Sequence, residues 1–129
     1  MILLFITFFA LFHILGDIVL QTKQQEIDKH INFRHLLEHV LIYSVTMVIP
    51  LLLNDFLHIF SYQLNVGEHF KGITLFFSIM FISHLIIDYF FSKIIEKNSN
   101  NSKKFLISVQ VDQLIHYLVL YSTLFFLYM

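Results

Sequence analysis

Residues 72–91 read GITLFFSIMFISHLIIDYFF, a run of twenty residues in which Asp88 is the one formally charged side chain. A helix of about twenty apolar residues crosses the hydrocarbon core of a bilayer. Stretches of similar length and composition occur three more times, so we expect four transmembrane helices. The predicted spans are Met1–Leu20, Leu36–Leu53, Gly72–Phe91 and Phe105–Met129.

The composition of the whole chain supports this interpretation. Hydrophobic residues make up 57% of the 129 residues and charged residues 13%, about half the charged share of a typical soluble domain. A soluble domain of this size must cover a large surface with polar groups. We therefore predict a single all-α integral membrane domain over residues 1–129, a transmembrane bundle of about four helices with the lipid bilayer as its partner.

The charge and the cysteine count exclude several classes of protein. The net charge is −1, and the few Lys and Arg residues form no basic groove, so we expect no nucleic acid partner. The chain has no cysteine, which excludes disulfides, thiolate metal sites and iron–sulfur clusters.

The connections between the spans differ in their basic residues. The first, Gln21–His35, and the third, which contains KNSNNSKK at residues 97–104, carry seven Lys and Arg residues between them, whereas the second, Asn54–Lys71, carries one. Basic connections stay in the cytoplasm, so both termini should face outward. We also expect a short interfacial helix in the first connection and an interfacial course for the second.

Each predicted span carries two polar residues four positions apart, a spacing that places both on one face of a helix. Spans one and three run toward the cytoplasm and carry their pairs late, whereas spans two and four run away from it and carry theirs early. All four pairs should therefore meet at one depth, on the cytoplasmic side of the membrane. The pairs are His13/Asp17, His35/His39, His84/Asp88 and Asp112/His116.

The three aspartates of these pairs need positive charge, because an ionised group inside a bilayer is costly and the spans contain no Lys or Arg. Imidazole and carboxylate are common ligands of Zn, Mn and Fe, and helix bundles build metal sites from such pairs. We predict one or two divalent ions: two ions with a hydroxide neutralise three aspartates, and one ion leaves a single negative charge for Arg34. The predicted ligands are His13, Asp17, His39, His84, Asp88, Asp112 and His116.

Five further residues have predicted roles around this site. Glu38 or His35 is a candidate general base, because each lies at the start of the second span. Arg34 could bind a phosphate. Gln21 lies four residues after Asp17 and Gln113 follows Asp112, so either amide could orient a ligand from outside the metal's own shell.

The motifs His13-Ile-Leu-Gly-Asp17-x-x-Leu-Gln21, His84-x-x-x-Asp88 and Asp112-Gln113-x-x-His116 together resemble a family of small bacterial and phage integral membrane proteins of unknown function. The resemblance covers essentially the whole chain, implies a multi-pass protein of the bacterial inner membrane, and favours His39 over His35 in the second span. The chain is also loosely similar to inner-membrane proteins described as metal-dependent hydrolases, although it has Phe33-Arg34-His35 where they carry His-Arg-Gly.

The favoured hypothesis is a membrane-embedded metal-dependent hydrolase acting on a lipid-linked or amphipathic substrate at the cytoplasmic interface, where the metal would polarise a phosphoryl or carbonyl oxygen; a lipid or a phosphoester is the expected substrate. Proton- or ion-coupled transport is an alternative, although one subunit shows no polar path through the outer halves of its spans; a homo-oligomer is compatible with the sequence. A b-type haem protein and a structural protein with hydrogen-bonded His/Asp pairs are the remaining hypotheses. Haem needs no Asp one turn from each His.

Overall fold

The computed structural model describes residues 2–57 and 66–128, with side chains described for residues 4–54 and 70–127. Within these ranges all regular structure is helical, which confirms the all-α part of the predicted fold class. The elements are α1 (Ile2–Ile14), the π-helical segment η1 (Leu15–Val19), α2 (Lys23–Asp28), α3 (Phe33–Leu57), α4 (Val66–Lys97) and α5 (Ser102–Tyr128).

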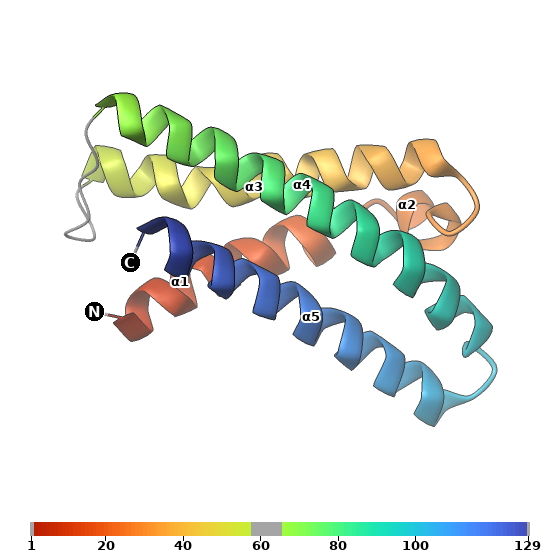
Figure 1. Ribbon diagram of the computed structural model, residues 1–129. Helices are drawn as coiled ribbons and strands as arrows, with labels where there is room; N and C mark the ends of the chain where they lie inside the picture. Colours follow the sequence, from red (N-terminus) through yellow and green to blue (C-terminus); the bar gives the residue numbers. More distant parts are fainter. Residues whose placement is uncertain (1, 58–65, 129) are drawn as a thin grey trace.

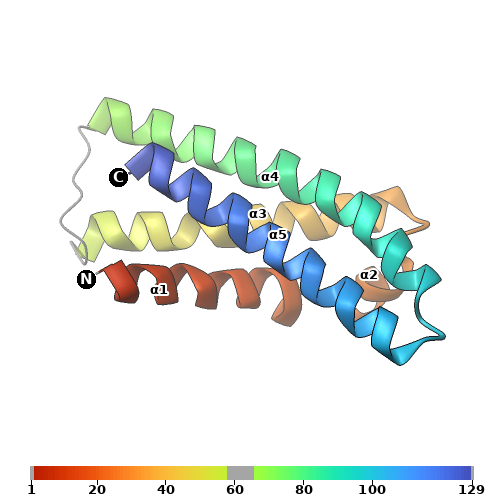
Figure 2. The same cartoon turned by 60° about the horizontal axis from the view of Figure 1, so that its bottom comes forward.

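The four longer helices α1, α3, α4 and α5 lie side by side in an elongated bundle (Figures 1 and 2). α4 packs against both α3 and α5, and α1 with η1 packs against α3. The N- and C-termini lie at one end of the bundle, and α2 lies at the opposite end with the turn between α4 and α5 (Figure 1). Both termini are therefore on the same side, as four alternating spans require.

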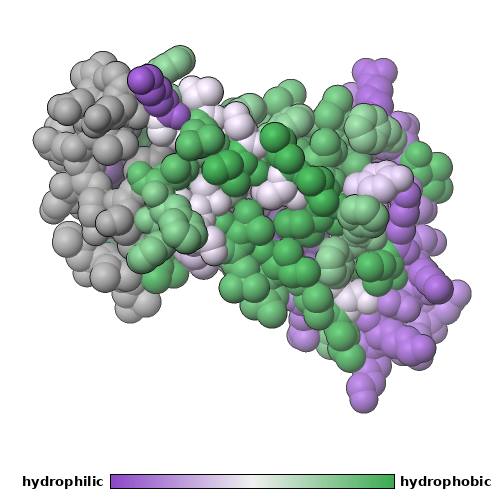
Figure 3. Space-filling view, in the orientation of Figure 1, coloured by the Kyte–Doolittle hydropathy of each residue, from purple (hydrophilic) through white to green (hydrophobic). Residues whose placement is uncertain are grey.

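Among the described residues, three helices are long and apolar enough to cross a membrane, and their apolar stretches are Phe33–Asn54, Phe70–Lys97 and Ser102–Leu127. The fourth apolar stretch, Leu4–Val19, is shorter. Three of the four predicted spans therefore coincide with helices that could cross a membrane, and the crossing itself stays a prediction for all four. Apolar side chains cover the middle of the molecule, and hydrophilic side chains gather at the end that carries α2 and the α4–α5 turn (Figure 3).

The first connection contains the short helix that the sequence predicts. Thr22 ends the preceding segment and caps α2: its hydroxyl accepts a hydrogen bond from the backbone N–H of Gln25 at 3.2 Å. The side chain of Gln25 in turn accepts one from the backbone N–H of Thr22 at 3.0 Å, which completes a capping box. In the second connection, residues 58–65 lie outside the described part of the chain, so its predicted interfacial course stays a prediction.

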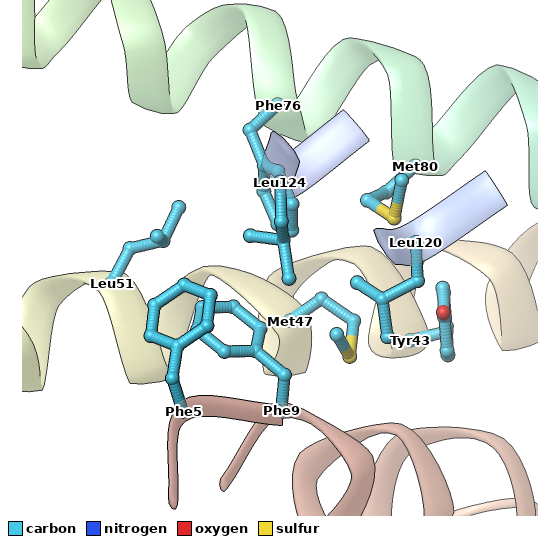
Figure 4. Close-up of a cluster of buried hydrophobic side chains, with 9 residues drawn as sticks. All are labelled: Phe5, Phe9, Tyr43, Met47, Leu51, Phe76, Met80, Leu120 and Leu124. Carbon is cyan, nitrogen blue, oxygen red and sulfur yellow. The ribbon is translucent and has the colours of Figure 1, made fainter. Parts of the chain in front are cut away.

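The apolar core occupies the half of the bundle near the termini, with side chains from α1, α3, α4 and α5 packed together (Figure 4). The rings of Phe5 and Phe9 lie 4.8 Å apart. Tyr43 lies at the inner edge of this cluster, where the apolar core meets a group of buried polar residues. The core residues are Phe5, Phe9, Tyr43, Met47, Leu51, Phe76, Met80, Leu120 and Leu124.

Candidate metal centre

The seven residues predicted as ligands all lie inside the bundle, and each is at most 6% exposed. They come from all four of the longer helical segments: α1 with η1, α3, α4 and α5. The i, i+4 spacing explains this convergence, because each pair lies on the inward face of its helix at a similar height. The set is His13, Asp17, His39, His84, Asp88, Asp112 and His116.

Four of these residues bring one ligand atom each into a group with tetrahedral spacing. Nε2 of His39 lies 3.2 Å from Oδ1 of Asp17, 3.2 Å from Oδ2 of Asp88 and 3.2 Å from Nε2 of His84. Nε2 of His84 lies 3.3 Å from the same Asp17 oxygen and 3.6 Å from the same Asp88 oxygen. A tetrahedral metal with ligands at 2.0–2.1 Å has edges of about 3.3–3.4 Å. Five of the six edges, at 3.2–3.6 Å, thus lie close to the length that a bound ion requires, and the sixth, between the two carboxylate oxygens, is within 4.8 Å.

A second group adjoins the first and shares Asp88 with it. Oδ2 of Asp88 belongs to the tetrahedral group, whereas Oδ1 lies 3.5 Å from Nε2 of His116. Asp112, His116 and Asp88 can bring ligand atoms within 4.8 Å of one another. Nδ1 of His116 donates to the backbone carbonyl of Asp112 at 3.0 Å, which leaves Nε2 with its lone pair. Asp88 is therefore placed as a carboxylate that could bridge two ions.

Several polar atoms of the two groups have no hydrogen-bond partner in the described part of the chain. Nε2 of His116 and Oδ1 of Asp112 are buried and unpartnered, and so are the Nδ1 atoms of His39 and His84. Leaving such atoms unpaired is costly. An ion in the second group would use the first two atoms. In this respect His39 and His84 differ from most metal-bound histidines, in which the ring nitrogen that does not bind the metal usually has a hydrogen-bond partner.

His13 lies beside these groups and is held by hydrogen bonds on both of its nitrogens. Its Nε2 donates to the side-chain carbonyl of Gln113 at 3.1 Å, so its Nδ1 accepts from the hydroxyl of Tyr43 at 3.0 Å. The amide of Gln113 also donates to Oδ2 of Asp17 at 2.7 Å. Gln113 therefore connects His13 to a member of the tetrahedral group, the arrangement predicted for an orienting residue. A ligand role for His13 stays a prediction.

The π-helical segment brings Asp17 into the centre. Leu20 donates its backbone N–H to the carbonyl of Leu15 at 2.9 Å, five residues back, and such π-turns frequently occur at functional sites. Gly16 lies in this segment against α3. A Cβ at this position would lie 3.2 Å from Cβ of Thr46 and 3.3 Å from the ring of Tyr43. The absence of a side chain at Gly16 thus lets η1 approach α3 closely.

A lysine from the first connection reaches into the centre. Nζ of Lys29 donates to Oδ2 of Asp88 at 2.9 Å, and its side chain is 17% exposed. Burial disfavours the charged ammonium, but the carboxylates of Asp88 and Asp17 outweigh burial and raise the pKa of Lys29. Arg34, the predicted counter-charge, is instead 84% exposed and pairs with Glu38 at 2.8 Å. The structure therefore places Lys29, and not Arg34, against the aspartates.

The other predicted residues lie around the centre rather than in it. Glu38 is 45% exposed and bonded to Arg34. Nδ1 of His35 lies 3.9 Å from a carboxylate oxygen of Asp28, and neither His35 nor Glu38 belongs to either group of ligand atoms found among the described residues. Their catalytic role, like phosphate binding by Arg34, stays a prediction. Gln21 lines a cavity that opens beside the centre, with its side-chain nitrogen unpartnered within the described residues.

This cavity has a volume of about 820 Å³ and lies at the α2 end of the bundle. Its walls come from η1, α2, the last turns of α4 and the first turns of α5. Asp17, Asp112 and Gln113 form its inner wall, and Lys29 also lines it. The candidate metal centre therefore has a side that opens to a space large enough for a small molecule.

Comparison with known protein families adds one result. The family described as "Protein of unknown function (DUF3307)" matches residues 4–128. The chain belongs to this family. The DUF3307 match includes every residue of the centre and of the cavity wall. No curated protein and no solved structure matches the chain significantly. Membership of DUF3307 thus establishes the family, and the activity must be argued from the site.

Two further residues of this DUF3307 centre are not among those predicted from the sequence. Tyr43 follows His39 by four positions, so it extends the polar face of α3, and its ring stacks on His84 with centroids 3.8 Å apart. That spacing is a signal that could have identified it. Lys29 has no comparable signal, because a lysine in a polar connection is normally solvated; its position depends on how α2 folds back onto the bundle end.

Proposed function

We propose that the protein is a membrane-embedded divalent-metal-binding protein that acts as a metal-dependent hydrolase on an amphipathic or lipid-linked phosphoester. The observation that carries the proposal is the tetrahedral spacing of Asp17, His39, His84 and Asp88. Hydrogen bonds alone explain it poorly. Nε2 of His39 is 3.2 Å from three other polar atoms, and a single N–H cannot bond to all of them. An ion at the middle would satisfy all four ligand atoms.

The charge of the centre also favours a cation. Asp17, Asp88 and Asp112 contribute −3 and Lys29 contributes +1, so the buried groups have a net charge of −2 when the histidines are neutral. One divalent ion cancels this charge. Zn, Mn and Fe all accept imidazole and carboxylate together, and this donor set by itself does not select one of the three.

The two groups suit different tasks. A metal with four protein ligands is closed and is typical of structural sites, whereas catalytic sites keep a position for water. Asp17, His39, His84 and Asp88 would form the closed site. Asp88, Asp112 and His116 would leave an open position, and Asp112 faces the cavity. A metal there would supply hydroxide from bound water near neutral pH and polarise a phosphoryl oxygen.

The position of the centre favours a substrate that lies in the membrane interface. Basic residues gather in the first and third connections, at the end of the bundle that carries α2. By the positive-inside rule this end would face the cytoplasmic side of the bacterial inner membrane, and the termini would face the outside. An amphipathic molecule in that leaflet would present its head group at the depth of the cavity.

The first test is metal content. The protein would be purified in detergent without chelators, and bound metals quantified by mass spectrometry. The comparison is a His84→Ala/Asp88→Ala variant, which removes two ligands from α4. The matched control is Thr74→Ala/Ser78→Ala on the same helix, because these exposed hydroxyls bond to carbonyls of their own helix at 2.8 Å.

We expect one or two equivalents of Zn, Mn or Fe in the wild type and in the control, and none in the ligand variant. A metal-loaded protein should then release phosphate from a phosphoester amphiphile. No metal in any sample, even after incubation with each ion, would contradict the proposal and favour hydrogen-bonded His/Asp pairs with a structural role. A haem absorption spectrum would contradict it as well.

A further inference from the structure

The cavity beside the centre is lined by both polar and apolar side chains. Its apolar wall includes Ile18, Ile27 and Phe105, which are 57%, 54% and 41% exposed. These side chains belong to the outer surface of the bundle as well as to the cavity, so the apolar wall continues onto the face that would contact lipid. A chain of methylene groups could therefore lie with one end in the cavity and the rest in the bilayer.

The inner end of the cavity is polar and contains two donors suited to an anion. Lys29 provides an ammonium that already bonds to Asp88 at 2.9 Å. Ser92 follows Asp88 by one helical turn on α4, is 7% exposed, and its hydroxyl has no hydrogen-bond partner among the residues described. A buried hydroxyl without a partner is costly, and a ligand oxygen in the cavity would satisfy it.

The charge balance identifies the kind of head group. One divalent ion would neutralise the centre, so an anionic ligand corresponds to the state with an ion in each ligand group. Two divalent ions and Lys29 then contribute +5 against −3 from Asp17, Asp88 and Asp112, which leaves +2. A phosphate monoester carries a charge of about −1.5 to −2 at neutral pH. The remaining lining carboxylates are Glu26, Asp28 and Glu96. Glu26 and Glu96 are exposed, and the side chain of Asp28 is 40% exposed and lies 3.9 Å from Nδ1 of His35, so water screens all three. The inner end thus suits a dianion, and the outer wall suits a hydrocarbon chain.

From these observations we infer that the cavity between α2, α4 and α5 binds a single-chain lipid phosphate monoester, with its phosphate at Lys29, Ser92 and the open metal position and its chain along Ile18, Ile27 and Phe105. This inference rests on the proposed function and specifies its substrate class. The volume of the cavity, about 820 Å³, lies within the range of small-molecule pockets.

Binding is tested with dodecylphosphonate, whose carbon–phosphorus bond resists hydrolysis. Radiolabelled probe would be titrated onto metal-loaded protein in nanodiscs, and the metal content of every sample measured in parallel. Val109→Trp places a large ring in the cavity wall without changing any proposed ligand. Leu118→Trp is the matched control on the same helix, because Leu118 is 59% exposed and lies outside the cavity wall. Ser92→Ala removes one hydroxyl without adding volume.

We expect Val109→Trp to weaken binding at least tenfold, Ser92→Ala to weaken it by roughly tenfold through the loss of a hydrogen bond to a charged group, and Leu118→Trp to leave it unchanged. All three should retain the metal. Inorganic phosphate should compete only at far higher concentration, and uncharged dodecanol should not compete.

Two results would overturn the inference while leaving the proposed function intact: metal-loaded wild type that does not bind the phosphonate, or equal binding by Val109→Trp, Ser92→Ala and wild type. Equal competition by inorganic phosphate would show that free phosphate, and not a lipid, is the ligand. Wild type that holds no metal would overturn the proposed function itself, and this inference with it.

Discussion

Replacing Lys29 by methionine tests whether the buried ammonium stabilises the centre before metal binds. Nζ of Lys29 lies 2.9 Å from Oδ2 of Asp88, and the two side chains are 17% and 2% exposed. Opposite charges at that separation attract by about 6 kcal/mol at an effective dielectric constant of about 20. Desolvation offsets part of this, and breaking a buried pair typically costs about 3–5 kcal/mol. Because Lys29 retains some exposure, we expect the metal-free protein to lose about 3 kcal/mol of unfolding free energy.

The measurement is unfolding by sodium dodecyl sulfate from bicelles with chelator present, followed by circular dichroism because the chain has no tryptophan. The control is Lys23→Met, which changes an exposed lysine at the start of α2, the helix that ends just before Lys29, and should alter stability by less than about 0.5 kcal/mol. Saturating Zn²⁺ should reduce the Lys29→Met loss, because the metal supplies positive charge to the same carboxylates.

A double-mutant cycle with Asp88→Asn separates the ion pair from other effects of the substitution. The loss in Lys29→Met/Asp88→Asn should be smaller than the sum of the single losses by at least about 1 kcal/mol. A coupling below about 0.5 kcal/mol would refute the reasoning, because that is the strength of an exposed ion pair.

Three further substitutions probe how the centre is positioned. Gly16→Ala should destabilise the protein by about 1–2 kcal/mol in the same unfolding assay, because the new Cβ would lie 3.2 Å from Thr46; a stabilised variant would contradict this. Tyr43→Phe should lower the free energy of unfolding by about 1 kcal/mol, because it removes the hydrogen bond to His13. An unchanged free energy of unfolding would show that the hydroxyl contributes nothing to stability. Gln113→Leu should weaken metal affinity roughly tenfold in competition with a chelating dye, and an unchanged affinity would argue against its orienting role.

The convergence of the His/Asp pairs was accessible from sequence because it depends on two simple regularities. Spacing of i, i+4 places both members of His84/Asp88 on one helix face, and alternating helix direction brings that pair level with Asp112/His116. Neither regularity needs knowledge of side-chain contacts. The three longest apolar stretches were predictable for the same reason, since length and hydropathy are properties of the sequence alone.

What sequence could not supply is the arrangement of the first connection. The helical stretch through η1 ends at Val19, and the capping box at Thr22 starts α2 in a new direction, which carries Lys29 back to Asp88. A lysine twelve residues after Asp17 carries no periodic signal of this contact. Arg34 was the more obvious candidate for the counter-charge of the aspartates because it lies beside the second span. The guanidinium of Arg34 instead forms an ion pair with Glu38, four residues later on the same helix. The cavity likewise depends on this folding of α2.

X-ray absorption spectroscopy of the bound ion tests the central claim most directly, because it reports the ligands of the metal itself. After loading with one equivalent of Zn²⁺, the account predicts nitrogen and oxygen ligands at about 2.0–2.1 Å, with the outer scattering of two imidazole rings from His39 and His84. His84→Ala/Asp88→Ala should lose this signal. A wild-type spectrum without imidazole scattering, equal to that of the variant, would contradict the existence of the metal centre.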